Sequence, residues 1–393
     1  MNILNNLDKL AELNIKKITD KSDLYLLKYD RETSDFTNDA VNEARGIILE
    51  NTTNRIVCYS LNKMNKDFNE TDVNWSDCKV YEAIDGTQIR LYYYNDEWNV
   101  TTTRCINAKS SSWNYMKSFY QLYKDVEVDV TNLNEDYTYT FILKHIENRI
   151  VSKIRKNELI HIHTRNNKTF EEVNETIENI KQPIELEYEN YEDLKRDLKN
   201  STIDTRGYVI HYENKKYLIE TDEYKYVKEL KGNHRNITYQ YIDLFRMNKY
   251  DEYLEYYPEK KMLFDSVKSE LTGLSSLLHD YYMKKNIKKE IKFNDIPVHL
   301  RKIIYNLHSI HINERKIITR DVIYEYLHEQ SPGYIINILK HKIILQRPTT
   351  PTTPTTPTTP TTPTTPTTPT TPTTPTTPTT PTTPTTPTTP IIQ

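Results

Sequence analysis

The sequence predicts an α+β protein in three parts: an antiparallel-sheet domain, an all-helical domain and a proline-rich tail. Short runs of alternating apolar and polar residues recur between about residues 24 and 226, a pattern typical of antiparallel strands. From residue 237, apolar residues recur at spacings of three and four, as in helices. A Pro-Thr-Thr repeat then runs from Pro348 to Pro390. We therefore place the domains at 1–230 and 231–347, and the tail at 348–393.

Strands of the first domain are predicted where β-branched and aromatic residues alternate between turns rich in Asn, Asp or Gly. Ten segments fit: 46–49, 56–61, 80–84, 88–94, 98–103, 137–143, 149–154, 159–163, 208–212 and 217–220. Helical spacing interrupts them at 112–123 and 169–180. The first domain is thus predicted to be mainly antiparallel sheet.

Helices of the second domain are predicted where apolar and aromatic residues fall on one side of a 3.6-residue period. They are 237–257, 262–284, 298–307, 319–328 and 333–345. In the tail, a disordered polyproline II conformation would put every proline on one edge of an extended rod. We interpret it as a spacer; a proline-recognising protein partner or a glycosylated stalk remain alternatives.

Composition excludes several classes of protein. The net charge of −3 with 27% charged residues excludes a globally basic nucleic-acid binder, so any RNA contact must come from a local patch. The 3 cysteines are odd in number and fit no zinc spacing, which favours reduced thiols. No apolar run suits a signal peptide or a membrane span. We therefore expect a cytoplasmic protein that does not bind membranes.

The sheet domain carries a series of short motifs. In chain order they are 43–48 (Glu-Ala-Arg-Gly-Ile-Ile), 65–70 (Asn-Lys-Asp-Phe-Asn-Glu), 81–87 (Tyr-Glu-Ala-Ile-Asp-Gly-Thr), 140–143 (Thr-Phe-Ile-Leu), 148–151 (Asn-Arg-Ile-Val), 206–209 (Arg-Gly-Tyr-Val) and 217–221 (Tyr-Leu-Ile-Glu-Thr). Their order and spacing resemble those of the T-even phage type RNA ligase family, in the ATP-dependent nucleotidyltransferase superfamily. The helical region stands where that family has its C-terminal domain.

This resemblance implies a fold, a reaction and cofactors. The fold would be the antiparallel-sheet nucleotidyltransferase domain of RNA and DNA ligases, similar to ATP-grasp proteins. The reaction would be RNA repair with ATP and Mg. A lysine attacks the α-phosphate and holds AMP as a phosphoramidate, which then passes to an RNA 5′-phosphate before a 3′-hydroxyl seals the nick. A viral source with an AT-rich genome fits both the family and the 31 Tyr against 8 Phe.

The catalytic positions that the resemblance implies are substituted. Ala83 stands where the nucleophilic lysine is expected. Ile142 and Arg206 replace carboxylates that hold metal and nucleotide, and Leu218 and Glu220 replace two lysines that face the phosphates. Loss of the nucleophile removes the covalent pathway, and loss of one preorganised charge partner typically costs about a hundred- to a thousandfold. We therefore expect a pseudoenzyme with no catalytic residue and no metal ligand.

Other motif residues match the family's nucleotide-binding scaffold. They are Arg45, Lys66, Phe68, Asp85, Gly86 and Arg104, and Tyr29 would add an aromatic face. The resemblance implies that these residues form the remnant of a nucleotide or RNA-end pocket. The alternative is that the Arg-Gly and Asp-Gly pairs fix turns and buried hydrogen bonds.

Several side chains can be interpreted in two ways. If the strands of Arg206 and Glu220 are neighbours, the two residues form a salt bridge; alternatively Arg206 faces a phosphate. Lys144 is the candidate for a relocated nucleophile, because Lys79 lies roughly 13 Å along the strand from position 83. His161 and His163 share a strand face, where we expect an exposed edge or the polar half of a strand rather than a metal site.

The leading hypothesis is an inactive or impaired RNA-ligase-like protein that binds nucleotide or RNA ends. Its first alternative is an active RNA ligase with a relocated nucleophile. The second is a structural or interaction protein that uses the tail as a spacer. The basic run 284–289 could contact RNA phosphates, although such runs are usually solvated.

Overall fold

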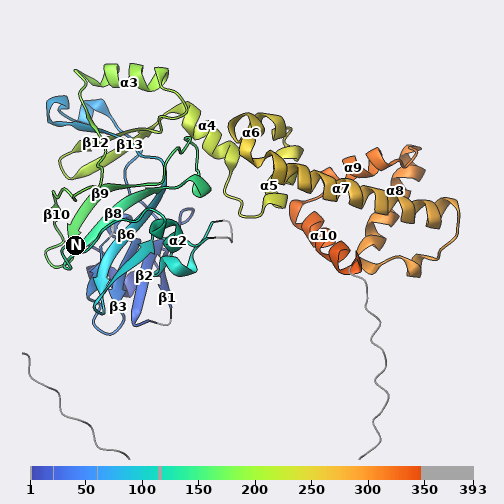
Figure 1. The fold of residues 1–393 in the computed structure, drawn as a ribbon, viewed down its shortest axis with the longest axis horizontal. Coiled ribbons are helices and arrows are strands. Elements are labelled where there is room, and N and C mark those ends of the chain that lie inside the picture. Colours follow the sequence, from blue (N-terminus) through green and yellow to red (C-terminus); the bar gives the residue numbers. More distant parts are fainter. Residues whose placement is uncertain (1, 21, 60, 114–116, 347–393) are drawn as a thin grey trace, which may run out of the picture. The chain divides into compact units, whose positions relative to one another are not determined.

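The computed structural model describes residues 2–20, 22–59, 61–113 and 117–346 (Figure 1). Within these residues the predicted class is confirmed: antiparallel sheets form the N-terminal part and helices the C-terminal part. The predicted tail at 348–393 lies outside them. Every described helix is too short or too polar to cross a bilayer.

Three antiparallel sheets build the N-terminal part. The first has the order β1 (Ile15–Thr19), β2 (Leu24–Tyr29), β3 (Arg45–Glu50) and β4 (Ile56–Cys58). The second has the order β10 (Glu172–Val173), β9 (Glu158–Asn166), β8 (Tyr137–Lys144), β6 (Thr87–Tyr94) and β7 (Glu97–Thr102). The third has the order β11 (Glu185–Leu186), β5 (Lys79–Glu82), β12 (Gly207–Tyr212) and β13 (Lys215–Glu220). The alternating apolar residues form their cores, for example Ile89 and Leu91 of β6, both fully buried.

Short helices cover the sheets. They are α1 (Asp39–Glu43), α2 (Phe119–Lys124) and α3 (Tyr191–Asn200). Each begins at a side chain that accepts a hydrogen bond from the backbone of its first turn, supplied by Asn38, Ser118 and Asn190, so the local sequence fixes where each helix starts.

The C-terminal part is helical. Its helices are α4 (Asp222–Lys231), α5 (Ile237–Arg246), α6 (Tyr250–Tyr256), α7 (Lys261–Tyr282), α8 (Val298–Glu314), α9 (Arg320–Glu329) and α10 (Pro332–Gln346). The long helix α7 packs against α5, α8, α9 and α10. Tyr224 and Val227 of α4 belong to the same apolar core. The predicted boundary at residue 230 therefore falls inside α4, and the division into domains stays a prediction.

Two predicted elements are wrong. Residues 149–154 form no strand, because the backbone N–H groups of Val151 and Ser152 donate to the Asp85 carboxylate rather than to a neighbouring strand. Residues 169–180 form no helix: Phe170 has a φ of 67° and Asn179 a φ of 61°, and β10 pairs within the segment.

Other elements differ in extent or were not predicted. Of the helix predicted at 112–123, the structure describes α2 from Phe119 onward, while 114–116 lie outside the described residues. The pattern at 237–257 is two helices, α5 and α6. Strands β1 and β2 and helices α1, α3 and α4 were not predicted. The strands predicted around positions 83, 142 and 218, which position the candidate site, are present.

Candidate functional site

A cavity of about 830 Å³ is lined by residues from all three sheets. Tyr29 and Arg45 come from the first sheet, Ile142 from the second, and Val209 and Leu218 from the third. A volume of this size lies within the range of small-molecule sites. The cavity therefore has room for a nucleotide.

Sequence motifs that lie far apart in the chain meet in this cavity. All five substituted positions line it, namely Ala83, Ile142, Arg206, Leu218 and Glu220. Of the expected nucleotide-binding remnant, Arg45 and Lys66 line it. The other four, Phe68, Asp85, Gly86 and Arg104, are not among its lining residues.

Ala83 follows β5 at the cavity wall. Its backbone N–H donates to the carbonyl of Gly207 at 2.9 Å, which fixes the residue against the third sheet. The side chain is only 8% exposed and offers a methyl group where covalent capture of a nucleotide needs an amine. Position 83 itself can perform no nucleophilic step.

Arg206 and Glu220 form an ion pair, as one of the two readings predicted. The Nε of Arg206 donates to Oε1 of Glu220 at 2.9 Å, and its Nη1 donates to the carbonyl of Ile84 at 2.9 Å. Lys228 Nζ also donates to Oε1 of Glu220, at 3.1 Å. Burial raises the pKa of the Glu220 carboxyl, but the two cations outweigh it and hold that pKa below its usual value. Glu220 is thus ionised and already neutralised.

Arg45, unlike Glu220, has no oppositely charged partner among the described residues. It begins β3, and its guanidinium donates to the carbonyl of Asn62 at 3.3 Å. No carboxylate of the described chain pairs with it. Burial lowers the pKa of this guanidinium, and the nearby Arg90, Arg206 and Arg31 lower it further. Arg45 is partly buried, and a cation partly withdrawn from water without a counterion is unfavourable, so this position favours an anionic ligand.

Histidines form another wall of the cavity. His161 is 3% and His163 is 6% exposed, so the expected exposed edge is wrong: β9 lies between β8 and β10 and carries both imidazoles inward. Burial lowers the pKa of His161 to about 4 and that of His163 well below its usual value. Burial likewise lowers the pKa of His211 to about 4. The wall is therefore neutral at pH 7.

Asp85 and Gly86 support the backbone instead of facing the cavity. The Asp85 carboxylate accepts hydrogen bonds from the backbone of Val151 and Ser152, both at 2.9 Å, and from the Tyr224 hydroxyl at 2.6 Å. A Cβ at Gly86 would lie 2.6 Å from Cγ2 of Ile142. This pair therefore fixes a turn and buried hydrogen bonds, as the alternative reading held.

Phe68 and Arg104 also lie elsewhere. The Phe68 ring packs against Trp75, Tyr191 and Tyr217, with ring centroids 4.8–6.4 Å apart. Arg104 is exposed. Neither side chain can be assigned to a nucleotide in the cavity.

Four lysines line the cavity, and the candidate Lys144 is not among them; neither is Lys79. Lys216 pairs with Glu172 at 2.8 Å, as Lys228 does with Glu220. Lys63 and Lys66 form no ion pair with the described residues. Burial lowers the pKa of Lys63, as do the neighbouring cations Lys66 and Arg45. Sequence reasoning missed Lys63, although it lies three residues before a motif lysine.

Three of the four carboxylates that line the cavity already have cationic or N–H partners; the fourth, Glu175, accepts from the Tyr139 hydroxyl at 3.4 Å. Glu220 is held by Arg206 and Lys228, and Glu172 accepts from Arg165 at 3.1 Å and from Lys216 at 2.8 Å. Glu82 accepts from the backbone of Ile184 at 3.1 Å. Because these oxygens already have cationic or N–H partners, a magnesium ion would have to displace them.

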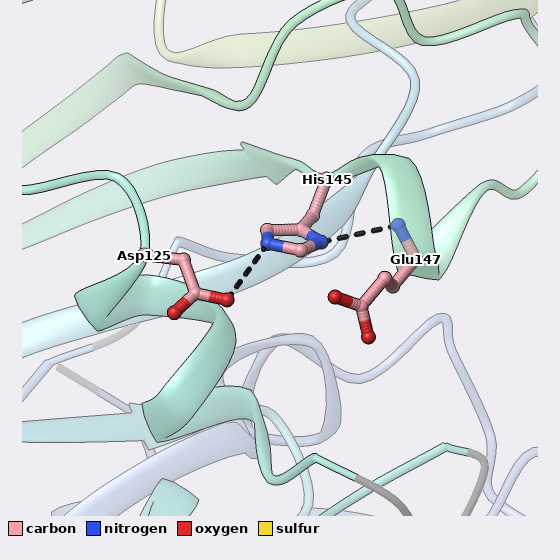
Figure 2. A group of neighbouring side chains, drawn as sticks. All are labelled: Asp125, His145 and Glu147. Carbon is pink, nitrogen blue, oxygen red and sulfur yellow. Dashed lines mark hydrogen bonds and ion pairs between the residues drawn. The ribbon is translucent and has the colours of Figure 1, made fainter.

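A second group of possible metal ligands lies outside the cavity lining (Figure 2): Asp125, His145 and Glu147. His145 Nε2 lies 3.2 Å from Asp125 Oδ2, and its Nδ1 accepts from the Glu147 backbone N–H at 3.1 Å. The Lys117 ammonium lies 2.9 Å from the Asp125 carboxylate and 2.6 Å from that of Glu147. A lysine thus supplies the cation, and the group is an ion-pair network.

Similar proteins were found among viruses. The chain is 23% identical over 323 residues to an "Immediate-early protein ICP-46 homolog" of Invertebrate iridescent virus 6, covering 70% of each protein. A protein of the same description from Invertebrate iridescent virus 3 is 23% identical over 280 residues, covering 65% of this chain and 62% of that protein. A stretch of 110 residues is 32% identical to a "Putative bifunctional polynucleotide kinase/RNA ligase" of Autographa californica nuclear polyhedrosis virus, covering 25% of this chain and 16% of that one. No protein-family model matches.

Similar solved structures include ligases. An "Archaeal ATP-dependent RNA ligase" is 10% identical with a TM-score of 0.43, covering 62% of this chain and 65% of its own. A "Putative ATP-dependent DNA ligase from Aquifex aeolicus" is 13% identical with a TM-score of 0.39, covering 67% of this chain and 76% of its own.

Proposed function

We propose that this chain is an RNA-ligase-like protein that binds a nucleotide, or the 5′-phosphorylated end of an RNA, without forming a covalent adenylate at position 83. The observation that carries the proposal is the partly buried guanidinium of Arg45, which no described carboxylate neutralises. A phosphate is a matching counterion, because a guanidinium binds its oxygens through two parallel hydrogen bonds.

The surroundings of Arg45 support a nucleotide rather than a bare anion. Arg31, Lys63 and Lys66 also line the cavity and form no ion pair within the described chain. Tyr29 and Phe36 add aromatic rings, which lie 5.0 Å apart at their centroids. Cations for phosphates beside rings for a base suit a nucleotide.

The proposed outcome is binding without chemistry. Ala83 supplies no amine, and the cavity carboxylates of Glu220 and Glu172 are engaged by Arg206, Lys228 and Lys216. The short similarity to a viral protein described as a polynucleotide kinase/RNA ligase agrees with a ligase ancestry. In this proposal the chain keeps recognition of a phosphorylated end and loses its adenylation at the motif position.

Calorimetric titration tests the proposal. We expect AMP and a 5′-phosphorylated dinucleotide to bind, and the same dinucleotide with a 5′-hydroxyl to bind at least tenfold more weakly. Equal affinity for the two dinucleotides, or no detectable binding of AMP and of the phosphorylated dinucleotide, would contradict the proposal.

One observation favours a second function, that of an active ligase with a relocated nucleophile. Lys63 lines the cavity without a carboxylate partner, its Nζ lies 3.7 Å from the centre of the Phe36 ring, and its pKa is lowered. A neutral amine there could attack the α-phosphate of ATP; the nitrogen–phosphorus bond would form as the bond to pyrophosphate breaks, with the amine proton passing to solvent. A covalent AMP on wild type but not on Lys63→Arg would establish this function.

A further inference from the structure

Four cations gather beside the cavity: Lys28, Arg31, Arg104 and Arg235, here called the basic track. Arg31 is also a lining residue of the cavity. Arg31, Arg104 and Arg235 are exposed, and Lys28 is partly buried. Their side chains form no hydrogen bond or ion pair with the described residues, so their charges are available to a partner.

The backbone explains why two members of the track, Lys28 and Arg104, lie near Arg45. Lys28 of β2 is the cross-strand partner of Arg45 in β3. The buried Arg90 donates to the carbonyls of Gly46 and Thr102, each at 2.5 Å. This clamp holds the turn after β7, which carries Arg104, against the start of β3.

The cations lie close enough to change one another's pKa values, from the cavity outward. Arg31 is close enough to Arg45 and to Arg104 to lower the pKa of both guanidinium groups. Arg235, in the loop between α4 and α5, likewise lowers the pKa of Arg104. Like charges therefore continue from the partly buried Arg45 to Arg235, between helices α4 and α5.

In another basic segment, two of the lysines have acidic partners. In the run 284–289, Lys284 pairs with Asp280 at 2.8 Å and Lys288 lies 3.9 Å from Glu290. Near the track, Asp30 is engaged by Lys16 at 2.6 Å. The track thus keeps a net positive charge, which raises the local concentration of anions.

We propose that a single-stranded nucleic acid leaves the cavity along the basic track, with successive phosphates against Arg31, Arg104 and Arg235. The proposal rests on the proposed function, because the nucleotide in the cavity would be the terminal residue of this strand. A flexible single strand can follow a bent line of cations that starts inside a cavity, whereas a duplex is too wide to enter it.

The chemistry of the track indicates recognition of the backbone rather than of sequence. Its members are long, flexible cations, and Tyr29, which lines the cavity, has a hydroxyl close enough to influence Arg45 and Arg104. Arginines contact phosphates, and an aromatic face stacks any base. Binding should therefore tolerate changes of base.

The experiment compares AMP with fluorescent 5′-phosphorylated ten-nucleotide strands of RNA and DNA, each titrated at several salt concentrations. We expect the strands to bind at least tenfold more tightly than AMP. The double variant Arg104→Ala/Arg235→Ala should weaken strand binding by roughly tenfold at low salt. It should also make the plot of the logarithm of the association constant against the logarithm of the salt concentration less steep. The slope should change by about 1.4, or about 0.7 for each lost phosphate contact. AMP binding should change less.

Arg196→Ala is the matched control, because it removes an equally exposed arginine from α3; it should leave strand binding within twofold. Comparison of RNA with DNA tells which strand the track prefers. If AMP binds but strands bind no better, or if the double variant behaves like Arg196→Ala, the track is only a solvated surface and the inference is overturned. If AMP does not bind while strands do, the proposed function of the cavity fails and the strand-binding surface stands alone.

Discussion

Arg206 and Glu220 lie 2.9 Å apart at the two cavity positions where the resemblance implies an acid and a base in the reverse order. The inversion keeps a charge pair between the start of β12 and the end of β13, but here the two side chains neutralise each other. The Glu220 carboxylate is engaged by Arg206 and Lys228, and among the described residues no carboxylate is left to pair with Arg45.

A double-mutant cycle tests the coupling of this pair. Arg206→Met and Glu220→Met should each destabilise the fold, because each leaves a largely buried charge with fewer partners. The double variant should be more stable than the sum of the two predicts, with a coupling of about 1–3 kcal/mol in urea denaturation. The exposed pair Lys261 and Asp265 on α7 serves as the control, and equal coupling in both pairs would show that burial adds nothing.

Replacement of Arg45 by methionine should separate stability from binding. Without ligand, removal of a partly buried cation that no described carboxylate compensates should leave the melting temperature unchanged or raise it. Affinity for AMP should fall by roughly ten- to a hundredfold, because a charge-assisted contact is lost. Calorimetry and thermal denaturation measure the two effects. A large loss of stability with unchanged affinity would mean that Arg45 is purely structural.

Asp85→Asn should act on stability. Three hydrogen bonds converge on this carboxylate, and an amide cannot accept all of them, so we expect a loss of about 2–4 kcal/mol in the free energy of unfolding. Asp204→Asn is the control: Asp204 accepts from the backbone of Lys153 at 3.0 Å but is exposed. If folded Asp85→Asn has normal stability but a lower affinity for AMP, Asp85 takes part in nucleotide binding after all.

The buried histidines predict how stability depends on pH. In the unfolded chain an imidazole takes up a proton near pH 6.5, whereas folded His161 and His211 resist protonation until about pH 4. Between these values the unfolded state binds more protons, so the free energy of unfolding falls as pH drops from 6.5 to 4, by roughly 1–3 kcal/mol per histidine. His161→Gln should flatten this fall in denaturation series at pH 7 and pH 5. The control His279→Gln should not, and an equal response of the two variants would refute the assignment.

Restoring an amine at position 83 should not restore ligation. Ala83→Lys places the nucleophile, but Ile142, Arg206, Leu218 and Glu220 still lack the metal-binding and phosphate-binding groups that the resemblance implies. We expect no labelled protein after incubation with α-labelled ATP and magnesium, and no difference from the size control Ala83→Met. Strong labelling of the lysine variant would mean that the substituted positions are not what prevents the reaction.

Sequence patterns predicted the strands that carry positions 83, 142 and 218, because alternation of apolar residues reports directly on a half-buried sheet. They could not reveal the loop at 149–154, since its backbone N–H groups bond a carboxylate about 66 residues earlier in the chain. The same limit applies to the sequence at 169–180, where positive φ angles at Phe170 and Asn179 interrupt an apparently helical pattern.

The candidate site was predictable in part. Motif order correctly indicated that the substituted positions share one place. Three facts need coordinates: that Arg45 has no counterion among the described residues, that Asp85 faces a backbone loop, and that Lys63 lies on the cavity wall. Whether a charge has a counterion depends on the distance between side chains of different segments. Spacing within one segment of the sequence does not give that distance.

One measurement tests the central claim most directly. The protein is equilibrated with α-labelled ATP and magnesium, the label bound to native protein is measured by dialysis, and the same sample is then denatured and measured again. The account predicts saturable label on the native protein that Arg45→Met loses, and none on the denatured chain. Label that stays with the denatured chain, or native protein that never takes it up, would contradict it.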